Sequence, residues 1–172
     1  VRGPGADYLG TRFGVRNLGA GPLQLDASIR PSADGAGVVA ELTGQVGQFT
    51  INSHTELADP AEMRKLSSTL QVAGPDLSFA GGLAGVDRLP AEPFRLAIDV
   101  DRSGDTFSIS EAVLETADSR VDVSGSISEF RTLAGNDLRF SFKGAELARF
   151  RDLLELPAGL DGAFDIAGTL RA

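Results

Sequence analysis

The stretch FRLAIDVDRSGDTFSI, residues 94–109, decides the fold of this chain. Apolar side chains occupy every second position on both sides of Arg102-Ser103-Gly104-Asp105, and this alternation is typical of strands with one apolar and one polar face. Gly104 can adopt the positive φ that a tight turn requires. The stretch therefore predicts a β-hairpin between residues 94–100 and 106–110.

The same stretch also contains the beginning of a calcium-loop pattern. An EF-hand loop that starts at Asp99 needs a bidentate Glu at its last ligand position, but that position is Ser110, and Glu111 comes one residue late. The flanking residues alternate like strands, whereas an EF-hand has a helix on each side. The hairpin turn is the favoured interpretation, a weak calcium site is the alternative, and we predict no metal site.

The alternation recurs along the chain with a period of about 70 residues, which indicates a repeat protein. The segments GPDL (74–77) and GAEL (144–147) open two matching stretches, and Phe94 and Phe164 begin corresponding strands. We interpret the chain as a divergent first repeat unit, a second unit and a truncated third unit, with boundaries at 1–73, 74–143 and 144–172. Five strands are expected in each full unit.

A short helix is expected between the units. Leu147, Phe150 and Leu154 are spaced as on one face of a helix, and Pro157 would end that helix. The counterpart at 77–89 contains several glycines, each of which weakens a helix by about 1 kcal/mol. A loose turn is therefore expected there.

The apolar positions of the predicted strands should line one face of a sheet. The residues expected on that face are Leu23, Leu25, Ile29, Phe94, Leu96, Ile98, Phe107, Ile109, Val121, Val123, Ile127, Phe140, Phe142, Phe164 and Ile166. Leaving ten such side chains in water would cost roughly 15–30 kcal/mol, which a marginally stable domain cannot absorb. A second protein layer, stacking of the units, or a ligand with long apolar tails could cover this face.

Composition excludes several classes of function. The chain has 172 residues, a formal net charge of −8 and no cysteine, so a phosphate-tracking surface for nucleic acid, a disulfide and a thiolate metal site are not expected. His54 is the single histidine, and no nucleophile elbow, P-loop or zinc-protease motif occurs. We therefore predict that the chain is not an enzyme and has no catalytic residue and no cofactor. Its ends fall within strand patterns, so we expect it to be a segment of a longer protein.

Three segments resemble the repeating unit of AsmA-like proteins, a group that includes TamB. Residues 144–170 combine a G-x-[DE]-L opening, a leucine-rich helix that ends in Leu-Pro, and a strand of the form F-x-[IL]-x-G. ADSRVDVSGSIS (117–128) and NDLRFSFKGAEL (136–147) resemble the family's following and closing strands. The resemblance covers residues 74–172 well and residues 5–73 loosely.

This resemblance implies a mainly β fold, a curled, elongated antiparallel sheet that forms a groove-like repeat array with short helices between its units. Family members are anchored in the inner membrane of diderm bacteria, extend through the periplasm, and are regarded as conduits that carry phospholipid toward the outer membrane. The implied function is a segment of a periplasmic lipid-conducting hydrophobic groove, with phospholipid acyl chains as partners. The alternative is a structural or adhesive β-repeat module with a closed core and no lipid cargo.

Overall fold

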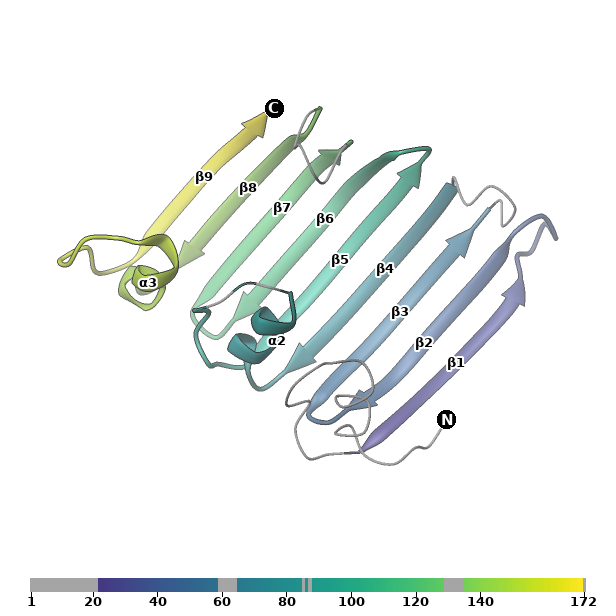
Figure 1. Cartoon of the computed structure of the whole chain (residues 1–172), viewed down its shortest axis with the longest axis horizontal. Helices are drawn as coiled ribbons and strands as arrows, with labels where there is room; N and C mark the ends of the chain where they lie inside the picture. The colour runs from purple at the N-terminus through teal and green to yellow at the C-terminus, as the bar shows by residue number, and fades with distance from the viewer. Residues whose placement is uncertain (1–21, 59–64, 85, 87, 129–134, 172) are drawn as a thin grey trace.

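The computed structural model describes residues 22–58, 65–84, 86, 88–128 and 135–171. These residues form one antiparallel sheet of nine strands that follow one another in chain order (Figure 1). The fold is mainly β, as predicted, and its short helical segments lie at one end of the strands. The sheet is open and not strongly curled. By itself it therefore does not form the curled, groove-like array that the resemblance implied.

Four strands precede the first described helix. They are β1 (Leu23–Pro31), β2 (Val38–Val46), β3 (Phe49–Leu57) and β4 (Lys65–Gly74), and the helix is α2 (Leu77–Ala84). The strands that follow are β5 (Phe94–Ser103), β6 (Thr106–Thr116), β7 (Ser119–Ile127) and β8 (Asp137–Gly144). A 3₁₀ turn, η1 (Leu147–Phe150), continues into α3 (Arg151–Leu154), and β9 (Phe164–Arg171) completes the sheet.

The hairpin predicted around Gly104 is confirmed. Ser103 pairs with Thr106 across a tight turn, and Gly104 has a φ of +64° there. β5 is longer than predicted, because it extends through Arg102 to Ser103. The described residues contain no group of three or more His, Cys, Asp or Glu side chains that could hold a metal ion.

The expectation of five strands in each full unit is wrong, because four strands lie between the two helical regions. Residues 106–116 form the single strand β6, in which a bulge between Ile109 and Ala112 interrupts the alternation. The extra residues of a bulge let the strand continue and keep the same face beyond it. Ile109 pairs with Val100 and Ala112 pairs with Ile98, so both return to the apolar side.

The loose turn expected after Asp76 is also wrong, because α2 is a regular helix. Asp76 caps this helix, since its Oδ1 accepts a hydrogen bond of 3.2 Å from the backbone N–H of Phe79. The ring of Phe79 stacks on Phe49 of β3, with 5.1 Å between ring centroids. The cap and this tertiary contact outweigh the low helix propensity of Gly81 and Gly82.

The two helical loops are built alike. The backbone N–H of Leu77 donates to the carbonyl oxygen of Glu92, and that of Leu147 donates to the carbonyl oxygen of Gly162, both at 2.9 Å. Each loop then leads into a strand that begins with phenylalanine. The division into repeat units remains an interpretation, because the sheet continues without a break from β4 to β5 and from β8 to β9.

Candidate functional site

The residues predicted to line one face do share a face of the sheet. Directly paired residues in an antiparallel sheet project to the same side. One row of such pairs crosses every strand and consists of Leu25, Gly44, Ile51, Val72, Leu96, Leu114, Val121, Phe142 and Ile166. We call the surface that contains this row the apolar face.

The remaining predicted residues lie on the apolar face by the same register and alternation. They are Leu23, Ile29, Phe94, Ile98, Phe107, Ile109, Val123, Ile127, Phe140 and Phe164. The structure adds apolar residues that the sequence prediction missed on β2, β3 and β4, among them Leu42, Ile51, Leu70 and Val72. Their alternation was visible, but Ser53, Thr55 and Ser68 interrupt it on the same face.

Helix α2 covers one end of the apolar face through a cluster of aromatic rings. Phe79 stacks on Phe49, and the ring centroid of Phe49 lies 6.2 Å from that of Phe94. Phe94 is only 4% exposed. Gly74 allows this packing, because a Cβ at that position would lie 2.3 Å from Cδ1 of Phe49.

A second aromatic cluster lies below η1 at the same end of the sheet. The ring of Phe142 meets Phe150 and Phe164 edge-on, with a centroid distance of 4.7 Å in both cases. Gly144 has the same role as the glycine in the first cluster, because a Cβ there would lie 2.6 Å from Cε1 of Phe164. We call the end of the apolar face that carries α2, η1 and α3 the helical end.

An ionic contact connects the two loops of the helical end. The Arg149 guanidinium lies 2.6 Å from a carboxylate oxygen of Glu92 and 2.7 Å from one of Asp118. The Glu92 side chain is only 7% exposed, so this carboxylate depends on its cation for compensation. Arg88 also donates a hydrogen bond of 3.2 Å to the carbonyl oxygen of Asp152.

The opposite end of the apolar face differs from the helical end, and we call it the open end. Among the described strand residues on the apolar face, Arg102 is the only charged one. It is paired with Leu66 on one side and Phe107 on the other. Its guanidinium carbon lies 5.3 Å from the centroid of the Phe107 ring, and its Nε donates to the carbonyl oxygen of Gly104 at 2.9 Å.

Much of the apolar face remains in contact with solvent. Side chains in its middle, such as Leu96 and Ile98, are half-buried by their neighbours. Toward the two edge strands exposure increases to 39% for Phe140, 40% for Ile166 and 77% for Ile29. Within the part of the chain that the structure describes, no second sheet covers this face.

The other side of the sheet is polar, and ion pairs cross its strands. Arg30 of β1 lies 2.8 Å from Glu41 of β2, and Lys143 of β8 lies 3.1 Å from Asp165 of β9. The hydrogen bond from Arg30 lowers the pKa of Glu41 below its ordinary value of 4.5. His54 lies on this face beside Glu41 and 3.2 Å from the exposed Glu56, so it belongs to a solvated charge cluster.

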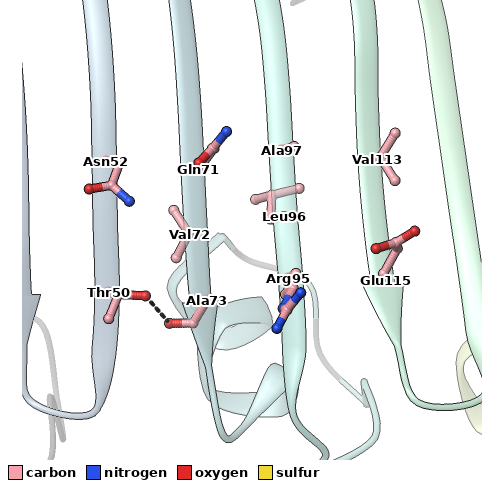
Figure 2. Close-up of a pocket in the computed structure, with 10 residues that line it drawn as sticks. All are labelled: Thr50, Asn52, Gln71, Val72, Ala73, Arg95, Leu96, Ala97, Val113 and Glu115. Atoms are coloured by element: carbon pink, nitrogen blue, oxygen red, sulfur yellow. Dashed lines mark hydrogen bonds between the residues drawn. The ribbon is translucent and has the colours of Figure 1, made fainter.

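The polar face also has a shallow hollow across β3 to β6 (Figure 2). Its floor is formed by Ala73 and Ala97, and longer side chains such as Asn52, Arg95 and Glu115 surround it. The hollow forms because alanine is short and its neighbours are long. Its lining offers hydrogen-bonding groups, among them the Asn52 amide, the Arg95 guanidinium and the Glu115 carboxylate.

Comparisons with protein-family models, with curated proteins and with solved structures found no match for this chain. The resemblance of residues 74–172 to AsmA-like proteins therefore remains a hypothesis. Across the described residues, no helix has the length and apolar character needed to cross a membrane.

Proposed function

We propose that this chain is a segment of a lipid-conducting surface whose apolar face is covered by phospholipid acyl chains. The observation that carries the proposal is the apolar row from Leu25 to Ile166, which crosses all nine strands of the sheet. An alkyl chain can contact such a row at the strands that the helical loops leave uncovered. It can also move to the next strand without passing a charged side chain within that row.

Free energy supports an apolar occupant of this face. Burial of each large aliphatic or aromatic side chain contributes about 1.5–3 kcal/mol, so a wet face of this size would be a large cost for a marginally stable chain. The helices cover only the helical end, and side chains such as Ile29 and Ile166 remain exposed. Contiguous apolar surface of this kind marks an interaction site.

The wider setting of the proposal comes from the resemblance to AsmA-like proteins. By this resemblance, we propose that the segment lies in the periplasm, within a protein anchored in the inner membrane, and takes part in phospholipid transport to the outer membrane. The groove-like curl belongs to this proposal too, because the twist of a sheet accumulates as strands are added. Such transport needs no covalent step and no cofactor in this segment.

The test is to express the chain in the periplasm of a diderm bacterium and to identify co-purified lipid by mass spectrometry. Ile98→Asp places a carboxylate in the middle of the apolar face, whereas Ala97→Asp places the same group on the polar face of the same strand. An acidic group in hydrocarbon costs about 2.5–3.5 kcal/mol, so the first variant should bind lipid roughly 60- to 300-fold more weakly and lose most of the co-purified lipid. The second variant should retain as much lipid as the unmodified chain.

Far-UV circular dichroism should confirm that both variants are folded. Equal lipid recovery from the two variants would contradict the assignment of the apolar face. A chain that carries no lipid and forms a dimer through the apolar face would instead support the structural module with a closed core.

A further inference from the structure

We propose that Arg102 binds the phosphate of a lipid headgroup at the open end, so that the acyl chains lie along the strands and point toward the helical end. This inference rests on the proposed function and adds to it the recognition of a phosphate and a fixed orientation of the lipid. Three observations support it: the position of the single charged strand residue described on the apolar face, the geometry of its guanidinium, and the distance from Arg102 to the helical end.

A cation on an apolar surface needs a compensating partner. Arg102 is half-buried between Leu66 and Phe107, and it forms no ion pair with any other residue that the structure describes. The polar face differs in this respect, because several of its cations face carboxylates across neighbouring strands. Arg102 is therefore a cation on the apolar face that no described carboxylate pairs with, and an anion from outside the described chain can pair with it.

The guanidinium of Arg102 is already oriented. Its Nε donates to the Gly104 carbonyl oxygen at 2.9 Å, and the group lies over the ring of Phe107 at 5.3 Å. Such cation–π contact restrains the plane of the guanidinium. The terminal NH₂ groups donate to no other described residue, and they form the fork that matches two oxygens of a phosphate.

The apolar face beyond Arg102 is about as long as one lipid. A strand rises about 3.3 Å per residue, so Arg102 and Leu96 lie about 20 Å apart along β5. A bilayer with its headgroup regions is about 40–45 Å thick, so one lipid of a leaflet spans about 20–22 Å from its headgroup to the ends of its acyl chains. A lipid whose phosphate lies at Arg102 therefore ends its chains near Leu96, next to the aromatic cluster around Phe94.

Because the chain is acidic, its overall electrostatic field does not attract phosphate. The chain carries a formal charge of −8, so a phosphate approaches only where a local cation is desolvated and oriented. Free phosphate gains the contact with Arg102 but none of the apolar burial. We therefore assign the site to a phosphate that is attached to acyl chains, and not to the inorganic ion.

The experiment uses fluorescence titration of the full chain with two labelled lipids that have the same acyl chains. One is phosphatidylglycerol, which has a phosphate, and the other is diacylglycerol, which lacks it. Arg102→Gln should weaken the binding of phosphatidylglycerol about 10- to 100-fold, the loss expected for a hydrogen bond to a charged group. Binding of diacylglycerol should change less than about twofold, and inorganic phosphate alone should show no saturable binding.

Lys65→Gln is the matched control, because Lys65 pairs with Ser103 at the same end of the sheet but on the polar face. This variant should bind both lipids normally, and Arg102→Lys should recover part of the lost affinity. If Arg102→Gln weakens both lipids equally, or neither, the inference is wrong while the proposed function stands. If the unmodified chain binds neither lipid, the proposed function fails as well.

Discussion

Two neighbouring glycines test whether α2 is a packed helix that closes the helical end. A Cβ added at Gly81 would lie 2.4 Å from Cδ1 of Leu89 and 2.7 Å from the carbonyl oxygen of Val86. A Cβ added at Gly82 would meet nothing within 4 Å. The two positions therefore share a helix and differ in their surroundings, which makes Gly81→Ala and Gly82→Ala a matched pair of substitutions.

The two substitutions should change the free energy of unfolding by different amounts. Alanine is preferred over glycine inside a helix by about 1 kcal/mol, so Gly82→Ala should stabilise the chain by up to that amount. Gly81→Ala has the same gain in propensity, but overpacking against a backbone oxygen costs about 1–3 kcal/mol. The free energies of unfolding of the two variants should therefore differ by about 1–3 kcal/mol, with Gly82→Ala the more stable.

Urea denaturation followed by far-UV circular dichroism measures this difference. With a urea dependence of about 2 kcal/mol per molar, the two midpoints should be about 0.5–1.5 M apart at an unchanged slope. Coincident midpoints would refute the packing, because a loose turn would give both glycines the same freedom. A higher midpoint for Gly81→Ala would refute it more strongly, since the added methyl group would then have met no obstacle.

Two further predictions concern charges at the helical end. Arg149→Met should lower the free energy of unfolding by about 3–5 kcal/mol, because it leaves the Glu92 carboxylate buried without its cation. Adding Glu92→Gln to this variant should restore part of the lost stability, as measured by urea denaturation. If the double variant were no more stable than Arg149→Met, the explanation would be wrong. Hydrogen bonds from the Ser78 hydroxyl and from the backbone N–H of Phe79 lower the pKa of Asp76 below its ordinary value of 3.8. The ionised Asp76 carboxylate therefore stabilises the folded chain above pH 3.8, and this stabilisation is lost as the pH falls through the lower pKa of the folded state. The difference in melting temperature between the unmodified chain and Asp76→Asn should therefore shrink between about pH 5 and pH 2, and a constant difference would show that the ionised form is unimportant.

The sequence was sufficient where a local pattern determines the structure. Alternation of apolar residues predicted the hairpin at Gly104 and the shared face of Leu96, Val121 and Phe142, because the side-chain period of a strand is two. It gave the wrong number of strands because the extra residues of the bulge in β6, before Ala112, look like the end of a strand. A bulge and a turn differ in the pairing partner, which a single sequence does not contain.

The other differences come from tertiary contacts. Helix propensity predicted a loose turn at Gly81, whereas the stacking of Phe79 on a distant strand makes that segment a helix. Arg102 was assigned to the turn, and its place on the apolar face became visible only because β5 continues through it. The curvature of the sheet is a property of all strands together, so no short stretch of sequence determines it.

The row from Leu25 to Ile166 bears on whether lipid, as we propose, or a protein layer occupies the apolar face. A protein layer packs well only when large side chains meet small ones in a fixed pattern, because interiors are as dense as crystals. In the row from Leu25 to Ile166 every position except Gly44 carries a branched aliphatic side chain or a phenylalanine, so the row offers nearly the same surface at each strand. A surface that repeats in this way specifies no register for a protein partner, but it suits flexible alkyl chains, which need contact and no fixed position. If a second copy of this chain were found to pack on this row in a single register, the uniformity of the row would have to be explained by something other than lipid.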